Sequence, residues 1–223
     1  MILSIELSNN NIKIMEAIKK GETLHVQKCM AINISKSIGI RDGKITDMNF
    51  IAGLINEELI KNNIKTKRAV FLINSGTIMI RKITLPLLKK KSEILSMIYI
   101  ELQQIVSINL SKYKIIYETA DIMCKNDTSY ADYIVYCVPE DLVDQYVILA
   151  EKLKLKLLKI DILPHAYNAI YKKNLKINDK YLASTAAFAE INENSISFSV
   201  VNNRICSFHI CCENYDDNFI EYA

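Results

Sequence analysis

Three runs at the start of the chain alternate between hydrophobic and polar residues or are continuously apolar and rich in isoleucine. They cover residues 2–8, 11–18 and 23–34, and a period of two residues predicts a β-strand for each run. Polar segments at Ser8–Asn11 and Lys19–Glu22 separate the runs, and asparagine tolerates the left-handed backbone that tight turns need. The chain is therefore predicted to begin with an antiparallel meander of three strands.

Helical and strand-like patterns alternate through the middle of the chain. Apolar residues at helical spacing, together with capping residues, predict helices from Thr46 or Asp47 to Asn62, from Ser92 to about Ile105, from Pro139 to Leu153 and from Pro164 to Lys173. Apolar runs between these helices predict strands at residues 68–73, 77–86, 113–123, 130–138 and 157–161. Residues 39–47 and 173–181 are polar, which favours a loop and a linker.

The pattern of the opening hairpin returns near the end of the chain. Further strand-like runs cover residues 184–191, 195–201 and 205–212. Glu6-Leu7-Ser8 aligns with Glu190-Ile191-Asn192, and Ile12 aligns with Ile196, at a constant offset of 190 − 6 = 184 residues. We interpret the two copies as an internal duplication in which the second copy is shorter.

Composition and charge exclude several classes of protein. The 223 residues are 50% hydrophobic and 24% charged, as in an ordinary globular protein. A net charge of +3 without a dense basic run argues against nucleic-acid binding. No apolar run approaches the roughly 20 residues that span a bilayer, and the N-terminus shows no signal peptide. We expect a cytoplasmic protein.

Motifs for metal binding or hydrolysis are missing from the sequence. The six cysteines form no C-x-x-C pair, and the three histidines are far from metal-ligand spacing. This pattern favours buried structural thiols in a reducing compartment and no metal site. An unrelated hydrolase is the weakest hypothesis, because the chain contains neither G-x-S-x-G nor a P-loop.

Four segments in a fixed order resemble the PilM family of type IV pilus assembly, within the actin-like ATPase superfamily. They are "IELSNNNIKIMEA" (5–17), "GIRDGKITDMNFIAGLINEELIKNNIKTKRAVFLI" (39–73), "MIRKITLPLLKKKSEILSMIYIELQQIV" (79–106) and "YIVYCVPEDLVDQYVILAEKLKLKLLKIDILPHAYNAI" (133–170). The resemblance runs from Ile2 to about Ile210. It implies an α/β, actin-like (ribonuclease H-like) fold with an inserted subdomain and an incomplete second half-domain. The implied units are residues 1–85 plus 130–175, the insert 86–125, and 180–223.

The resemblance also implies a remnant of a nucleotide site at the two hairpins. The family has Asp-x-Gly where this chain has Glu6-Leu7-Ser8 and Glu190-Ile191-Asn192. Glycine lets a backbone approach phosphate closely, and glutamate is one methylene longer than the aspartate that would face hydrated Mg²⁺. The remnant residues are Glu6, Ser8, Asn9, Asn10, Asn11, Lys13, Glu190 and Asn192. ATP and Mg²⁺ are the implied cofactors, but the substitutions lead us to expect no hydrolysis and no firmly bound cofactor.

A scaffold role follows from the same resemblance. PilM-like proteins bind the N-terminal cytoplasmic segment of a PilN-like inner-membrane partner and couple pilus motor ATPases to the membrane platform, so this chain is expected at the inner face of the membrane. The partner peptide is expected in a groove between the first half-domain and the insert. Its candidate residues are Arg81, Ile83, Leu85, Pro86, Ile94, Ile98 and Glu101. Plain core packing is the alternative for the apolar members.

Two other hypotheses stay open at the level of sequence. The first is a nucleotide-dependent switch using Glu6, Lys13 and Glu190, which retained binding of ATP and Mg²⁺ would support. The second is the type II secretion counterpart, which the identity of the partner's cytoplasmic segment would distinguish. In either case, we expect association through residues 184–212, with a second copy or with a partner, because this sheet has few covering elements.

Overall fold

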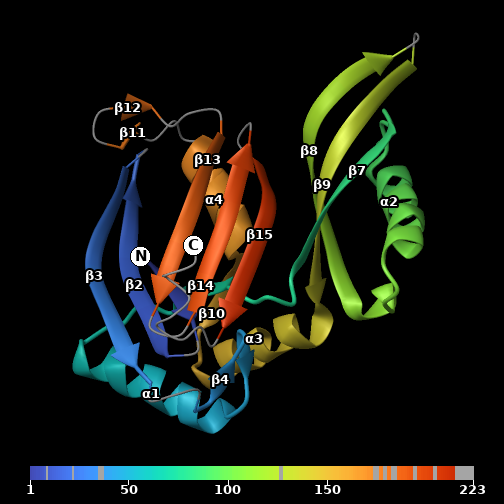
Figure 1. Cartoon of the computed structure of the whole chain (residues 1–223). Helices are drawn as coiled ribbons and strands as arrows, with labels where there is room; N and C mark the ends of the chain where they lie inside the picture. The colour runs from blue at the N-terminus through green and yellow to red at the C-terminus, as the bar shows by residue number, and fades with distance from the viewer. Residues whose placement is uncertain are drawn as a thin grey trace, which may run out of the picture.

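The structure is a computed structural model, and it describes residues 1–8, 10–21, 23–34, 38–125, 128–172, 176–177, 180–181, 185–192, 195–202 and 205–213. Figure 1 shows the chain as a mixed α/β molecule built on three main sheets. The α/β class expected from the sequence is confirmed.

A five-stranded sheet contains the beginning of the chain. It consists of β1 (Ile2–Leu7), β2 (Asn11–Lys20), β3 (Thr23–Asn33), β6 (Arg68–Ile73) and β10 (Lys156–Ile162), in the order β10-β6-β1-β2-β3. The first three strands pair antiparallel, whereas β1, β6 and β10 are parallel. The predicted meander is therefore confirmed, and β1 lies at the centre of the sheet.

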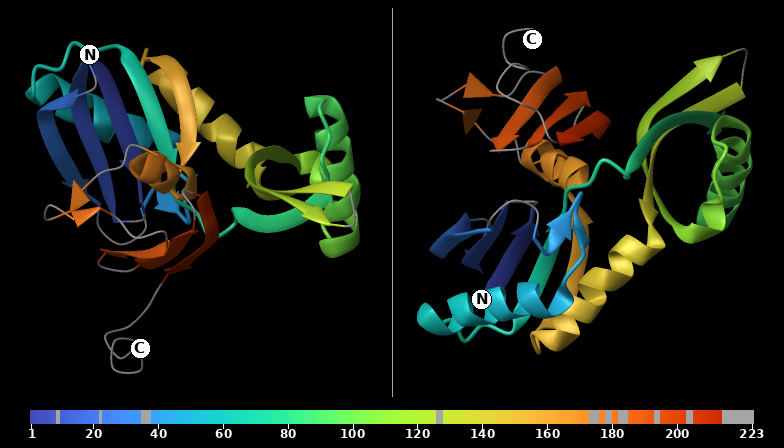
Figure 2. Two further views of the ribbon diagram at one scale, coloured as in Figure 1. Left: turned by 90° about the horizontal axis from the view of Figure 1, so that it is seen from above. Right: turned by 60° about the horizontal axis from the view of Figure 1, so that its bottom comes forward.

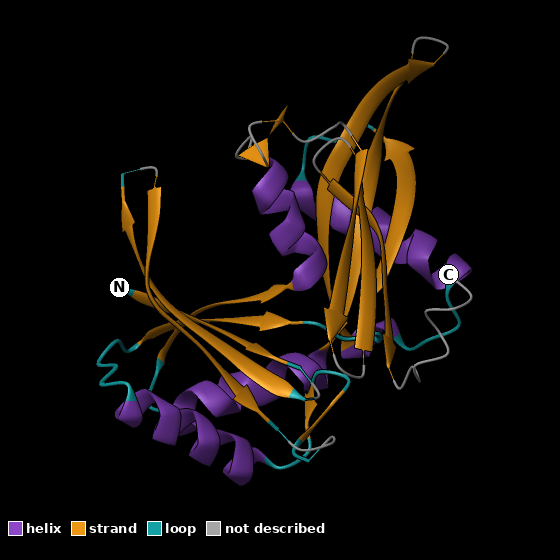
Figure 3. Ribbon diagram, turned by 60° about the vertical axis from the view of Figure 1, so that its left-hand side comes forward, coloured by secondary structure: helices purple, strands orange, loops and turns teal. Residues whose placement is uncertain are grey.

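Two helices cover one face of this sheet. They are α1 (Met48–Lys61) and α3 (Glu140–Lys152), and Figure 3 shows helices along one side of the sheet that carries the N-terminus. Every second side chain of β1 is fully buried in this core, and the ring of Phe71 in β6 meets Tyr146 of α3 edge to face at 5.7 Å between centroids. Asp47 caps α1 as predicted, because its carboxylate accepts a hydrogen bond from the Phe50 amide at 2.9 Å.

A smaller three-stranded sheet projects to one side of the molecule (Figure 2). Its order is β7-β9-β8, with β7 at Met79–Pro86, β9 at Thr128–Pro139 and β8 at Tyr113–Lys125. The helix α2 (Lys91–Ile105) packs on it through Ile94, Ile98 and Leu102, and the 3-10 helix η1 (Leu110–Lys112) leads into β8. The strands β7 and β9 belong to this small sheet, although the units expected from the sequence assign most of both strands to the first unit and only residues 86–125 to the insert. The division into units stays a prediction.

The C-terminal sheet is the second copy of the opening meander. It contains β13 (Thr185–Asn192), β14 (Ser195–Asn202) and β15 (Ile205–Glu213), paired antiparallel in that order. The helix α4 (Leu163–Lys172) packs on one side of it, where Tyr167 stacks on Phe188 at 4.4 Å between centroids. This contact joins α4 to the middle of β13.

Four details differ from the prediction. The predicted loop 39–47 contains a hairpin of β4 (Ile40–Arg41) and β5 (Lys44–Ile45), and the predicted linker contains β11 (Lys176–Ile177) paired with β12 (Lys180–Tyr181). The helix α2 is capped by Lys90 rather than Ser92, with no side-chain hydrogen bond at the cap. Pro139 ends β9 and precedes α3 instead of lying in its first turn. The last two differences lie at the starts of helices, where element bounds are least certain. The first two concern strands of two residues, which are too short to show a period.

Two further expectations concern the cysteines and membrane-spanning helices. All six cysteines are free; Cys137 and Cys206 are buried as expected, whereas Cys29 and Cys124 are exposed. In the described part of the chain, no helix combines the length and the apolar character needed to cross a bilayer.

Candidate functional site

The two hairpins that the sequence singled out pair in the same register. In the first hairpin Glu6 lies opposite Lys13, and in the second Glu190 lies opposite Ser197, which is 184 residues after Lys13. Glu6 and Glu190 are therefore equivalent positions on two equivalent hairpins. The second hairpin has no lysine of its own at this place.

Lys13 joins the two hairpins. Its ammonium group lies 3.3 Å from the Glu6 Oε1 and 2.6 Å from the Glu190 Oε1. The side chain of Lys13 is 38% exposed, and those of Glu6 and Glu190 are 15% and 20% exposed. One partly buried cation therefore bridges two carboxylates that are far apart in the sequence.

Burial and the charges of neighbouring groups shift the pKa values of Glu6 and Lys13. Burial raises the pKa of Glu6, and the nearby charge of Glu190 raises it further, against the opposing effect of Lys13. Burial by itself lowers the pKa of Lys13, but the hydrogen bond to Glu190 and the charges of both carboxylates outweigh it, so the pKa is raised overall. The ammonium group of Lys13 therefore stays charged and remains paired with the two carboxylates.

The remaining predicted residues of this site serve the turn or lie outside the description. The Ser8 hydroxyl donates to the backbone oxygen of Asn11 at 3.0 Å and contacts its Oδ1 at 2.8 Å. Asn10 is buried, and its Oδ1 has no hydrogen-bond partner among the described residues; the same holds for the Oγ of Ser197. Asn9 and the side chain of Asn192 lie outside the described residues. The structure therefore brings together Glu6, Lys13 and Glu190, with Ser8 and Asn11 bound to each other in the turn.

The apolar residues predicted for the peptide groove are core residues. Ile83 and Leu85 of β7 and Ile94 and Ile98 of α2 are buried in the cluster between α2 and the small sheet, and Ile98 is 0% exposed. The alternative of plain core packing therefore fits these four. Arg81 and Pro86 are exposed and Glu101 is half-buried; the Arg81 guanidinium donates to the carbonyl of Ile80 at 2.8 Å.

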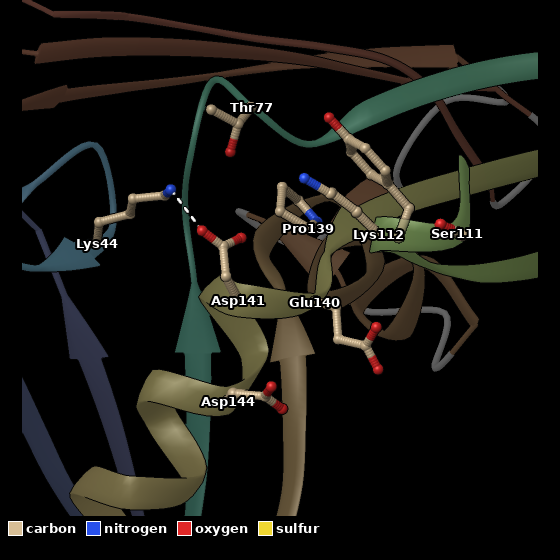
Figure 4. A pocket seen from close by; sticks show the side chains of 9 residues that line it. Lys44, Thr77, Ser111, Lys112, Pro139, Glu140, Asp141 and Asp144 are labelled. Atoms are coloured by element: carbon tan, nitrogen blue, oxygen red, sulfur yellow. Dashed lines mark hydrogen bonds and ion pairs between the residues drawn. The ribbon is translucent and has the colours of Figure 1, made fainter. Parts of the chain in front are cut away.

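A different surface is hollowed at the place where the small sheet meets the rest of the molecule. This junction pocket has a volume of about 600 Å³ and receives residues from β5, β8, β9, η1, α3 and the segment before β7 (Figure 4). Its lining residues are Lys44, Thr77, Ser111, Lys112, Tyr113, Pro139, Glu140, Asp141 and Asp144. None of the seven predicted groove residues is among them.

Two ion pairs at the junction pocket connect the start of α3 to β5 and to β8. The Lys44 ammonium lies 2.7 Å from the Asp141 Oδ2 (Figure 4), and this hydrogen bond is the main reason that the pKa of Asp141 is lowered. Lys114 of β8 pairs with Glu140 of α3, and the contact raises the pKa of Lys114. The pocket therefore combines fixed charges of both signs with the ring of Tyr113.

The sequence offers little sign of this pocket. Its lining residues lie between Lys44 and Asp144 and come from several elements, so no local motif contains more than three of them in a row. The acidic start of α3, with Glu140 and Asp141, is the one local signal, but acidic first turns are common because they favour the helix dipole. Only the packing of the small sheet against α3 brings the set together.

Comparison with solved structures identifies the fold. The PilM–PilN type IV pilus biogenesis complex matches 99% of this chain and 63% of the matched chain, with a TM-score of 0.77 and 12% identity. The cytoplasmic domain of EpsL, an inner-membrane component of the type II secretion system of Vibrio cholerae, matches 95% of this chain and 71% of that domain, with a TM-score of 0.52 and 8% identity. No curated protein sequence matches this chain.

The family follows from the sequence as a whole. The model of the family described as type IV pilus assembly protein PilM matches residues 4–210, which is most of the chain. The segments that carry the resemblance all lie within this range. The chain belongs to the PilM family of type IV pilus assembly proteins.

Proposed function

We propose that this protein acts as a scaffold in type IV pilus assembly and binds the N-terminal cytoplasmic segment of a PilN-like inner-membrane protein. Membership of the PilM family supports the process, and the similarity to a chain of a PilM–PilN complex supports the partner. This chain spans 63% of the length of the matched chain, and its activity and its partner are proposals. Binding of such a partner would place the protein at the inner face of the membrane.

We assign the partner segment to the junction pocket. The pocket lies between the small sheet and the part of the chain that contains the five-stranded sheet, where the groove was expected, although other residues line it. A volume of about 600 Å³ lies in the range of roughly 300–1,000 Å³ typical of ligand sites. The rigid ring of Tyr113 and the paired charges offer both apolar and polar contacts to a short extended peptide.

Calorimetric titration with the cytoplasmic peptide of the PilN-like protein tests this role. Wild-type protein is expected to give a saturable one-to-one isotherm. Ser111→Trp places a large ring in the pocket and is expected to weaken binding by about tenfold or more. Ser107→Trp is the matched control, because Ser107 is also exposed, lies just ahead of η1 and does not line the pocket.

Two outcomes would contradict the proposal in different ways. Equal weakening by both tryptophan variants would show that the peptide does not bind in the junction pocket. Absence of heat with wild-type protein would show that the PilN-like segment is not the partner. It would favour the type II secretion counterpart, whose own membrane partner can be titrated in the same way.

We further propose that the hairpin site does not hydrolyse ATP. Lys13 is bound by both carboxylates, and the Ser8 hydroxyl is directed to Asn11, so these two groups are already engaged. Calorimetric titration with ATP and Mg²⁺ is expected to give no saturable heat. Saturable binding that Lys13→Ala weakens would support the nucleotide switch instead. Contact with pilus motor ATPases stays a prediction from the family resemblance.

A further inference from the structure

Two short segments of the chain are rich in basic residues and contain no acidic residue. They are residues 61–68, with the sequence KNNIKTKR, and residues 152–156, with the sequence KLKLK. The first begins at the last residue of α1 and leads into β6, and the second begins at the last residue of α3 and leads into β10. Because the two segments lie far apart in the sequence, their charges add up only in the folded protein.

The fold places both segments at one edge of the five-stranded sheet. The strands β6 and β10 are parallel neighbours, Arg68 pairs with Lys156 at their starts, and the Lys156 amide donates to the Lys67 carbonyl at 2.6 Å. In Figure 3 two loops lead from helices into strands on the side of the N-terminus. We call the seven cationic residues of the two segments the basic edge: Lys61, Lys65, Lys67, Arg68, Lys152, Lys154 and Lys156.

The charges of the basic edge are open to solvent and mostly unpaired. All seven residues are exposed, and among the described residues only Lys61 forms an ion pair, with Glu58 at 3.7 Å. Glu16, which lies behind the first segment, is buried and accepts a hydrogen bond from the Thr66 hydroxyl at 2.5 Å. The basic edge carries more positive charge than the net +3 of the whole chain, so the rest of the molecule is net negative.

The dipoles of the two helices explain only part of this arrangement. A cation in the last turn of a helix is favourable because the carboxyl end carries a partial negative charge, and Lys61 and Lys152 occupy such positions in α1 and α3. The other members of the basic edge lie beyond the helices, in the loops and at the first residues of β6 and β10. Stabilisation of helix ends therefore leaves most of the cluster unexplained.

Apolar side chains next to the basic edge are also open to solvent. Ile60, which precedes Lys61, is 67% exposed, and Leu158 of β10 is 38% exposed. None of the seven cations lines the junction pocket. An anionic lipid surface suits this combination, because it attracts clustered lysines and accepts apolar side chains at the level of its headgroups.

We propose that the basic edge binds directly to the surface of an anionic phospholipid bilayer, with Ile60 at the level of the headgroups. The helix α3 runs from Asp141 at the junction pocket to Lys152 at the basic edge, a distance of about 17 Å at ~1.5 Å per residue. Roughly five extended residues of a peptide span that distance. A membrane-anchored segment can thus occupy the pocket while the edge lies on lipid, but the lipid contact does not rest on the proposed function.

Co-sedimentation of the full chain with lipid vesicles tests this contact without any partner protein. Wild-type protein is expected to bind vesicles of phosphatidylcholine with about 30% phosphatidylglycerol, but not vesicles of phosphatidylcholine alone. Raising the salt concentration to about 0.5 M should release it, because salt screens exposed charges.

Two triple variants with the same change in net charge locate the contact. Lys65→Gln/Lys67→Gln/Lys154→Gln neutralises three exposed cations of the basic edge; at roughly fivefold per lysine, it should bind the anionic vesicles about a hundredfold more weakly. Lys89→Gln/Lys90→Gln/Lys91→Gln is the matched control, because these lysines are also exposed but lie at the start of α2. The control should bind within about twofold of wild type.

A tryptophan reporter tests the position of Ile60. The chain contains no tryptophan, so Ile60→Trp provides a single indole beside the basic edge. Its emission should shift to the blue on anionic vesicles, because tryptophan settles at the membrane–water interface. Leu95→Trp, at a position 39% exposed on α2, should show no shift.

Several results would overturn the proposal. They include absence of wild-type binding to the anionic vesicles, equal weakening by the two triple variants, and an unshifted emission of Ile60→Trp on vesicles that bind the protein. Tighter binding to duplex DNA than to the vesicles, lost in the basic-edge variant, would assign the surface to nucleic acid instead. Titration of the basic-edge variant with the PilN-like peptide should be unchanged, so failure of the lipid contact and failure of the junction pocket are distinguishable.

Discussion

At the scale of single residues, the most informative group is the cation that joins the two hairpins. Lys13 contacts both Glu6 and Glu190, and its own equivalent in the second hairpin is Ser197. The sequence identified all three charged residues of this cluster, because the duplication aligns the two glutamates. It could not show that the lysine turns to both carboxylates, because that contact depends on how the two sheets approach each other.

Replacing Lys13 by methionine should destabilise the protein. Two partly buried carboxylates then face each other without a cation, and we expect the free energy of unfolding at pH 7 to fall by about 1–2 kcal/mol, less than for a fully buried pair because Lys13 is 38% exposed. Urea unfolding measures the loss. Lys19→Met on the same strand is the control, because Lys19 is exposed. Adding Glu190→Gln should restore part of the stability; no difference between the two lysine variants would contradict the role of Lys13.

A second charged group gives the stability a dependence on pH. His165 of α4 lies 2.8 Å from the Asp161 Oδ1 and 3.4 Å from the Glu118 Oε1. The hydrogen bond to Asp161, followed by that to Glu118, raises the pKa of His165 to about 9 from its ordinary 6.5. The folded state therefore holds this proton more tightly than the unfolded state, and the stabilisation is complete below pH 6.5.

Raising the pH should remove that stabilisation between pH 6.5 and about 9. We expect the free energy of unfolding to decrease by about 1–2 kcal/mol over this range, after allowance for the partial exposure of the histidine. His165→Gln should be less stable at pH 6.5 and should show a flatter profile. Urea midpoints measured at both pH values for both chains provide the test. Identical slopes would show that His165 does not carry the effect.

At the scale of elements, the hydrophobic pattern predicted nearly every helix and strand, but not which residues would stay accessible. Strands such as β1 alternate strictly, and α2 repeats its apolar residues at helical spacing, so their existence follows from periodicity. The same apolar residues of α2 were proposed for a peptide groove, and the structure buries them instead. Periodicity marks the buried face of an element, and a groove needs residues that are only half covered.

The substitution Ile98→Asp shows this difference. Were Ile98 a groove residue, the variant would lose partner binding and keep its fold. Because Ile98 is 0% exposed in the core of the small sheet, we expect the charge to cost about 3–4 kcal/mol and to unfold α2 from the sheet. Circular dichroism and urea unfolding measure the effect. Leu95→Asp, at a position 39% exposed on the same helix, should cost less than about 1 kcal/mol. A well-folded Ile98→Asp variant would restore the groove interpretation.

At the scale of the whole molecule, one side chain links three parts of the structure. Asn168 of α4 is 0% exposed and donates to the Glu118 Oε2 at 2.6 Å and to the Tyr136 Oη at 3.0 Å, both in the small sheet. Its Oδ1 accepts from the Cys206 amide of β15 at 2.6 Å. Sequence patterns do not predict such a joint, because its partners lie 32, 38 and 50 residues from Asn168.

Replacing Asn168 by leucine should loosen the C-terminal sheet from the small sheet while leaving the first sheet intact. The variant leaves the Cys206 amide without its buried partner and removes one of the two hydrogen bonds of the Tyr136 hydroxyl, so we expect a loss of about 2–3 kcal/mol. Hydrogen exchange should accelerate by about tenfold or more in β15, with little change in β1 and β2, because local opening follows the weakened contacts. Tyr136→Phe removes the hydrogen bonds to Asn168 and to the Cys206 carbonyl, but it leaves the Cys206 amide paired with Asn168 and should cause a smaller change. Uniform acceleration through the whole chain would mean that Asn168 supports global stability and does not act as a joint between the sheets.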